Sequence, residues 1–149
     1  MNNSPTPFNM ASLESASDTR HLHILVAEDN TINQRLITLL LTKMGHTVDV
    51  VENGARAVDA IRTSRYDIAF IDVQMPVMGG LEAAAEICRL HPRDSRPPLV
   101  ALTANALIGD RDKCLAAGMD GYLTKPLRTA SLAEILQQLM HTTGKSGPG

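Results

Sequence analysis

Three carboxylates follow two short apolar runs of the chain. Glu28 and Asp29 come directly after the run 24–27, and Asp72 comes directly after the run 68–71. A carboxylate at the end of a buried strand is costly unless another group compensates its charge. Two such strands side by side would bring the three acids into one pocket. That pocket could bind a hard cation, and one of its carboxylates could act as a nucleophile.

Two further residues supply what phosphoryl transfer to a carboxylate needs. Clustered acids repel one another, and a divalent cation such as Mg²⁺ removes that repulsion. Asp29 and Asp72 could bind the cation directly, while Glu28 could act through water. Asp72 would then attack phosphorus, and the cation, Lys125 and Thr103 would each take up part of the charge on the transferring group.

The pattern between these residues predicts the elements that position them. Three wholly apolar runs predict strands buried on both faces of a parallel sheet, and two runs interrupted by an acid suit its edges. Amphipathic segments separate the strands. The prediction is an α/β fold, a (βα)5 doubly wound five-stranded parallel sheet of flavodoxin-like order 2-1-3-4-5, with the acids at its switch point. The predicted strands are 24–27, 47–51, 68–71, 99–102 and 119–123, and the predicted helices are 31–44, 54–64, 80–90, 107–117 and a last one around 131–139.

Composition and charge bound the class of protein. The 149 residues suffice for one domain with a core, and a net charge of −2 leaves no basic footprint for nucleic acid. No apolar stretch has the length of a membrane span, and the start lacks a secretory signal. The two cysteines, far apart in predicted helices, are typical of reduced thiols in a cytoplasmic protein. The histidines form no clear metal set, so we expect surface roles for them.

The chain divides into three parts by composition. Residues 1–20 are rich in Ser, Asn, Thr and Pro, which predicts a flexible N-terminal extension or linker. Residues 21–142 carry the alternating pattern and form the expected domain. Residues 143–149 read as a flexible C-terminal tail.

Together these residues resemble the receiver domain of two-component response regulators. The matching motifs, in family-like order and spacing over about 23–140, are Glu28-Asp29-Asn30, Asp72-x-x-Met75-Pro76-x-Met78-x-Gly80, Thr103-Ala104 and Lys125-Pro126. The resemblance implies that Asp72 accepts a phosphoryl group from a phosphohistidine in a Mg²⁺-dependent reaction and switches conformation to signal. The sequence leaves open whether the Lys125-Pro126 peptide bond is cis.

The resemblance also implies a role for each motif residue. The implied Mg²⁺ ligands are Glu28, Asp29, Asp72 and the backbone carbonyl of Gln74. The implied switch pair is Thr103 and Tyr122, and Lys125 is the implied phosphate contact. Self-phosphorylation and slow autodephosphorylation are then the only reactions expected, rather than turnover of a substrate.

The residues in and around these motifs indicate a subtype of this family. The strings similar to receivers of hybrid sensor histidine kinases are Ile24-Leu-Val-Ala-Glu-Asp-Asn30, Asn33-Gln34, Val73-Gln-Met-Pro and Ala101-Leu-Thr-Ala-Asn105-Ala. The resemblance implies a receiver module of such a kinase, which can be the cytoplasmic part of a membrane-bound sensor, or else a stand-alone response regulator. Its implied partners are a histidine kinase or a histidine phosphotransfer domain, and we expect the helix 31–44 to contact the phosphodonor because it borders the pocket.

Two other functions fit the same sheet order. A Mg²⁺-dependent phosphatase with an aspartyl nucleophile usually needs a second acid two residues further on, where this chain has Gln74. A flavin-binding module needs a phosphate-binding loop after the first strand, where Glu28 and Asp29 would repel phosphate. Turnover of small phosphate esters would favour the first alternative, and a yellow purified protein would favour the second.

Overall fold

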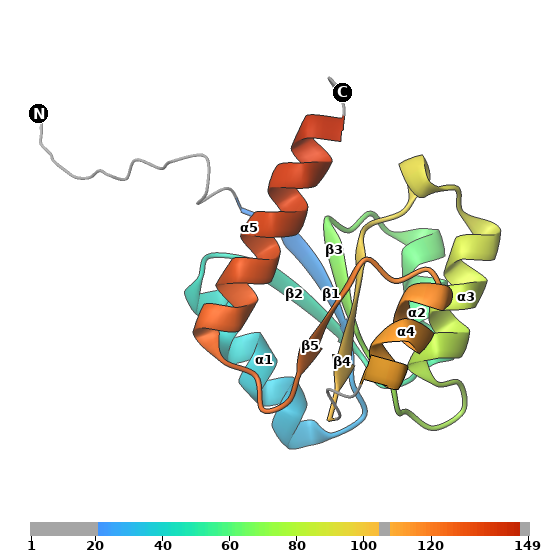
Figure 1. Cartoon of the computed structure of the whole chain (residues 1–149). Helices are drawn as coiled ribbons and strands as arrows, with labels where there is room; N and C mark the ends of the chain where they lie inside the picture. Colours follow the sequence, from blue (N-terminus) through green and yellow to red (C-terminus); the bar gives the residue numbers. More distant parts are fainter. Residues whose placement is uncertain (1–20, 105–107, 147–149) are drawn as a thin grey trace, which may run out of the picture.

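Five parallel strands form one sheet in the order β2-β1-β3-β4-β5 in the computed structural model, which describes residues 21–104 and 108–146 (Figure 1). The strands are β1 (His23–Ala27), β2 (Thr47–Val51), β3 (Ile68–Asp72), β4 (Leu99–Thr103) and β5 (Gly121–Thr124). The helices are α1 (Thr31–Lys43), α2 (Gly54–Thr63), α3 (Gly80–Leu90), α4 (Ile108–Ala116) and α5 (Thr129–Ser146), with a short 3₁₀ turn η2 (Arg93–Ser95). The predicted fold class and strand order are confirmed.

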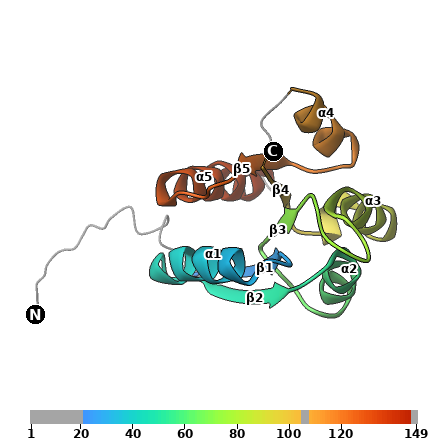
Figure 2. The same cartoon turned by 90° about the horizontal axis from the view of Figure 1, so that it is seen from below.

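The helices cover the sheet on both faces, α1 and α5 on one and α2, α3 and α4 on the other (Figure 2). Side chains of the central strands alternate between these faces, because successive strand residues point in opposite directions. Ile24 and Phe70 pack toward α1 and α5, whereas Leu25 and Ile71 pack toward α2 and α3. β1, β3 and β4 are almost wholly buried and β2 and β5 are not, as the apolar and interrupted runs predicted. In the described part of the chain, no helix has the length and apolar character that a bilayer crossing requires.

The bounds of β5 and α5 differ from the predicted ones by more than one residue. β5 begins at Gly121 rather than at residue 119, because the carboxylate of Asp120 accepts the backbone N–H of Leu99 at 2.9 Å and pairs with Arg93 at 2.9 Å. Asp120 therefore holds the start of β4 instead of lying in a strand. Helix α5 begins at Thr129 and continues to Ser146, into the stretch assigned to a C-terminal tail. The division of the chain at residues 20 and 142 stays a prediction.

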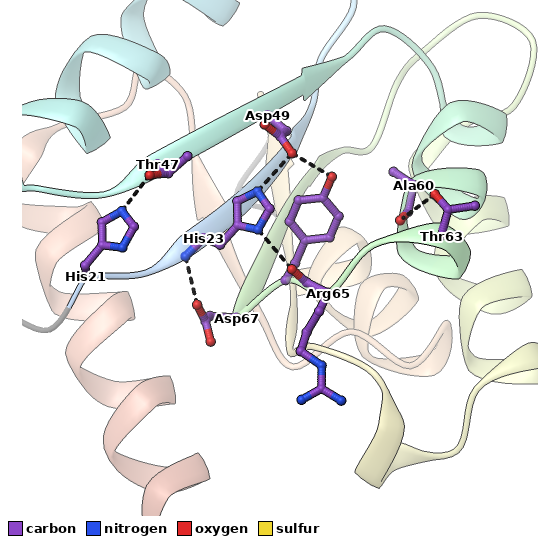
Figure 3. A network of polar contacts seen from close by, with 9 residues as sticks. His21, His23, Thr47, Asp49, Ala60, Thr63, Arg65 and Asp67 are labelled. Carbon is purple, nitrogen blue, oxygen red and sulfur yellow. Dashed lines mark hydrogen bonds and ion pairs between the residues drawn. The ribbon is translucent and has the colours of Figure 1, made fainter.

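A polar network joins the amino end of β1 to β2 and to the segment before β3 (Figure 3). The backbone N–H of His23 donates to the Asp67 carboxylate at 2.8 Å. In the His23 ring, Nε2 lies 2.9 Å from the Asp49 carboxylate and Nδ1 lies 3.0 Å from the Arg65 carbonyl. The Tyr66 hydroxyl donates to the same Asp49 oxygen at 2.9 Å, and burial together with this bond raises the pKa of Tyr66 to about 12. His23 therefore links β1, β2 and the start of β3, a larger role than the expected surface position.

Candidate functional site

The three acids meet at the carboxyl edge of the sheet. β1 and β3 are parallel neighbours with Ala27 opposite Ile71, so the residues that follow them, Glu28 and Asp29, lie beside Asp72. Carboxylate oxygens of the three acids lie within 4.8 Å of one another. Glu28 is 1% exposed and Asp72 5% exposed, whereas Asp29 faces solvent. The sequence prediction of a single acidic pocket is confirmed in its geometry.

Lys125 reaches this pocket from the loop after β5. Its Nζ lies 2.8 Å from Asp72 Oδ2 and 3.0 Å from Glu28 Oε1, so one ammonium group contacts two buried carboxylates. The backbone N–H of Lys125 donates to the carbonyl of Thr103 at 2.8 Å, which holds the loop to the end of β4. The peptide bond between Lys125 and Pro126, left open by the sequence, is cis.

The charges in the pocket do not balance. Burial raises the pKa of Glu28, and Asp72 raises it further, while Lys125 and the N–H of Asn30 pull it back in part. Burial acts to lower the pKa of Lys125, but the bonds to Asp72 and Glu28 outweigh it, so this pKa is raised and the amine stays charged. Lys125 contacts Glu28 and Asp72, and the carboxylate of Asp29 lies within 4.8 Å of those two acids, so the pocket keeps a negative excess.

The two carboxylate oxygens of Glu28 have different partners. Its Oε2 accepts the N–H of Asn30 at 3.1 Å, but among the described residues its buried Oε1 has no hydrogen bond and only the ionic contact with Lys125. This oxygen therefore depends on a positive charge rather than on a hydrogen bond, and a bound cation could supply that charge as well. All three side chains offer hard oxygen ligands, so the residues fit a hard divalent cation.

The loop between β3 and α3 is built closely around Asp72. The N–H of Gln74 donates to Asp72 Oδ1 at 3.0 Å, so this carboxylate is held at one oxygen by Gln74 and at the other by Lys125. A Cβ added to Gly80 would lie 2.2 Å from the Asp72 carbonyl oxygen, so only glycine lets α3 begin so close to the sheet. The role of the Gln74 carbonyl as a metal ligand stays a prediction.

The middle of the same loop makes a strained turn at Val77. Its φ is +69°, a left-handed value that is uncommon for a β-branched residue, and the N–H of Met78 donates across it to the carbonyl of Pro76 at 2.7 Å. The Met78 carbonyl then accepts the N–H of Gly54 at 2.9 Å. A Cβ added to Gly54 would lie 2.4 Å from that carbonyl oxygen, so the contact needs glycine. The turn after Asp72 is therefore fixed to the start of α2.

The predicted switch residues lie on the two strands beyond β3. Thr103 is buried at the carboxyl end of β4, the edge that carries the acids. Tyr122 lies on β5 opposite Ala101 and is half-buried on the α4 side of the sheet. The Arg111 guanidinium carbon lies 6.0 Å from the centre of the Tyr122 ring, within range of a cation–π interaction. The switching role of this pair stays a prediction.

Sequence reasoning missed one residue beside the acids. The side-chain N–H of Gln34, in the first turn of α1, donates to the backbone carbonyl of Glu28 at 2.5 Å. From the sequence alone, Asn33-Gln34 is interpreted only as a motif typical of a subtype of the family. Its signal was positional, because a polar side chain in the first turn of a helix can reach back to the preceding strand end.

A family model and curated proteins match the described domain. The model for the response regulator receiver domain matches residues 24–137. Hybrid signal transduction histidine kinase I of Dictyostelium discoideum is 40% identical over an alignment of 119 residues that covers 76% of this chain and 7% of that protein. Aerobic respiration control sensor protein ArcB of Escherichia coli K12 is 38% identical over 121 residues, 81% of this chain and 15% of that protein. The chain thus spans a small part of the length of these relatives.

Solved structures agree with this match. The receiver domain of sensor histidine kinase PA1611 from Pseudomonas aeruginosa PAO1, with a magnesium ion in its active site cleft, has a TM-score of 0.74 and 42% identity, covering 82% of this chain and 99% of that one. The receiver domain of Saccharomyces cerevisiae Ssk1, co-crystallised with the phosphotransfer protein Ypd1, has a TM-score of 0.75 and 30% identity, covering 80% and 88%. The fold, the acidic edge and these matches together make this chain a member of the response regulator receiver family of two-component phosphorelays.

Proposed function

We propose that Asp72 is the phosphoacceptor of this receiver and takes a phosphoryl group from a phosphohistidine on a partner protein. The single observation that carries this proposal is the setting of its carboxylate, buried and held by Lys125 at one oxygen and by the N–H of Gln74 at the other. In the reaction an oxygen of Asp72 bonds to phosphorus while the phosphorus–nitrogen bond of the donor breaks. The electron pair goes to the donor imidazole, which takes up a proton.

The cation of this site is Mg²⁺ in our proposal, bound by the carboxylates of Glu28, Asp29 and Asp72 and by the carbonyl of Gln74. The hard oxygen ligands of the three acids, the buried Oε1 of Glu28 without a hydrogen bond among the described residues, and the magnesium ion in the PA1611 receiver support this assignment. When bound, the ion would neutralise charge on the acids and on the phosphoryl oxygens.

The protein's own groups do the remaining work. The Lys125 ammonium, already at Asp72 Oδ2, is in reach of a phosphoryl oxygen on that carboxylate and would donate to it. The Thr103 hydroxyl, buried at the same edge, would donate to another oxygen. Phosphorylation then biases two pre-existing conformations: Thr103 moves toward the phosphoryl group, and Tyr122 occupies the vacated space. The surface of α4, β5 and α5 would carry the change to a partner.

The site favours a stored phosphoryl group over turnover. The residue two positions after the acceptor is Gln74, whose exposed carboxamide cannot protonate a leaving group. We therefore propose a signalling domain rather than a phosphatase. The relatives named above support a place within a hybrid sensor histidine kinase, with a stand-alone regulator as the other form. The two free cysteines are consistent with the cytoplasmic location that we propose.

Helix α1 is the surface that we assign to the phosphodonor, a histidine kinase or a histidine phosphotransfer domain. Ile32 and Leu39 are 76% and 53% exposed and lie seven residues apart, so they form an apolar stripe on one side of the helix. The helix begins at Thr31, two residues after Asp29, which puts its first turn next to the acids. The Ssk1 receiver was crystallised with such a phosphotransfer protein.

Intact-mass analysis with a small phosphodonor tests the acceptor. The wild-type chain should gain one phosphoryl group in the presence of Mg²⁺ and little without it. Asp72→Asn should gain none, and the control Asp94→Asn, at an exposed position far along the chain, should behave as wild type. An adduct on Asp72→Asn at the wild-type level would overturn the assignment, and steady hydrolysis of phosphate monoesters would favour the phosphatase.

A further inference from the structure

The three acids of the pocket are not held in the same way. Asp72 is bound at both carboxylate oxygens, and Glu28 is bound by Lys125 and by the N–H of Asn30. Asp29 is exposed, and within the described residues its side chain has no hydrogen bond and no ion pair. No contact therefore fixes the side-chain rotamer of Asp29, and its backbone sets the point from which the carboxylate can reach the other two acids.

That backbone is held from α1. The carbonyl of Glu28 and the N–H of Asp29 belong to one peptide unit, which is planar. The side chain of Gln34 donates to this carbonyl at 2.5 Å. The backbone N–H of Glu28 donates to the carbonyl of Val51 at 3.0 Å, so Glu28 is held on both sides. Gln34 thus fixes the peptide plane from which the Asp29 side chain leaves.

We propose that Gln34 is a positioning residue for the cation site, holding the Glu28–Asp29 peptide so that Asp29 faces the other two acids before a cation arrives. The inference rests on the proposed Mg²⁺ site. Like charges within 4.8 Å repel, and the exposed Asp29 is the acid that can turn away into water. Without Gln34 the cation has to draw Asp29 back, which costs affinity.

A purely structural role predicts something different. The start of α1 is already capped without the Gln34 side chain, because Asn30 accepts the N–H of Asn33 at 3.0 Å through its side chain and the N–H of Gln34 at 2.9 Å through its carbonyl. Loss of the Gln34 carboxamide therefore leaves the helix start intact. Its effect should appear in cation binding rather than in the stability of the cation-free chain.

The test compares Gln34→Met, which keeps the length of the side chain and removes the donor without adding charge, with the wild type and with Gln137→Met. Gln137 is exposed on α5 and offers the same substitution far from the acids. Calorimetric titration with Mg²⁺ should give a dissociation constant about tenfold higher for Gln34→Met, the size typical of groups that orient metal ligands. Gln137→Met should match the wild type. A second variant, Gln34→Asn, keeps the amide but is one methylene too short, and should show the same rise.

Phosphorylation supplies a second readout. The Mg²⁺ concentration for half-maximal phosphorylation of Gln34→Met should rise by the same factor, while the rate at saturating Mg²⁺ stays within about twofold of wild type, because Gln34 acts before the cation is bound. A dissociation constant within twofold of wild type in both Gln34 variants would overturn the role of Gln34 alone. Failure of the wild-type chain to bind Mg²⁺ would overturn the cation site itself and this inference with it.

Discussion

Replacing Lys125 by methionine removes the cation that contacts both buried carboxylates. At about 3 Å and an effective dielectric constant of about 20, each of its contacts with Asp72 and Glu28 supplies an attraction of about 6 kcal/mol. Burial of the ammonium group opposes these two terms, and removal of one partner from a buried pair costs about 3–5 kcal/mol in general. Glu28 can take up a proton and limit the loss. We therefore expect Lys125→Met to lower the free energy of unfolding by about 3 kcal/mol at pH 7.5 without Mg²⁺.

The pH dependence of this loss has a definite sign. Burial raises the pKa of Glu28 and Lys125 pulls it down, so Lys125→Met raises this pKa further above the unfolded value. A carboxyl group with a raised folded-state pKa contributes stability below its unfolded pKa and loses it as the pH rises through the folded one. The deficit of Lys125→Met relative to wild type should therefore shrink as the pH falls from 7.5 to 5.5.

Urea unfolding at both pH values, with and without Mg²⁺, measures the deficit. Saturating Mg²⁺ should reduce it, because the ion supplies the positive charge that the variant lacks. Lys43→Met is the control, since Lys43 is exposed at the end of α1 and should change stability by less than about 0.5 kcal/mol. A deficit below about 1 kcal/mol at pH 7.5, or one that does not shrink at pH 5.5, would refute the charge argument.

Three further predictions concern single positions. Val77 has φ +69° and is 84% exposed, so its replacement by asparagine relieves backbone strain and loses little packing. Val77→Asn should therefore raise the free energy of unfolding in urea by about 1 kcal/mol. An unchanged urea midpoint would contradict the strain at this residue. Burial lowers the pKa of His46 below 6.5, so the unfolded chain binds this proton more tightly and the wild type should lose thermal stability between pH 7.5 and 5.5. His46→Asn should lose less over the same range. Equal slopes of the melting temperature against pH for the two proteins would contradict this prediction. Gly80→Ala should lower the free energy of unfolding by at least about 2 kcal/mol, because its Cβ would press on the Asp72 backbone. Gly79→Ala, whose Cβ would lie 3.3 Å from its nearest neighbour, should lower it less in the same urea titration.

The strands were predictable where burial alone decides them. β1, β3 and β4 are covered on both faces, so their sequences are uninterrupted apolar runs with sharp ends. β5 was misplaced because Met119 is buried without being in a strand. It packs against the α4 side of the core from the turn that precedes β5. Hydrophobicity reports burial, and it does not separate a buried turn residue from a strand residue.

The acids were predictable for a related reason. A charge directly after a buried run must lie at a strand end, and parallel strands end at one edge. Contacts that depend on side chains from distant segments left no such pattern. The ring of His23 is held by Asp49 on β2 and by the Arg65 carbonyl before β3, and nothing in the local sequence of His23 indicates either partner. The turn at Val77 is equally hidden, because a valine normally indicates an extended backbone.

Lys125 and Gln34 hold the acids by different means, and this difference can be measured. Lys125 holds Glu28 and Asp72 by charge and competes with a cation for the same oxygens, whereas Gln34 binds a backbone carbonyl and competes for nothing. Lys125→Met should therefore weaken the fold and tighten Mg²⁺ binding, and Gln34→Met should leave the fold and loosen Mg²⁺ binding. Both residues contact Glu28, so the double variant tests their coupling: if Gln34 acts on Asp29 alone, the two effects on the Mg²⁺ binding free energy add to within about 0.5 kcal/mol. A larger deviation would mean that the side chain and the backbone of Glu28 move together, and that Gln34 positions Glu28 as well as Asp29.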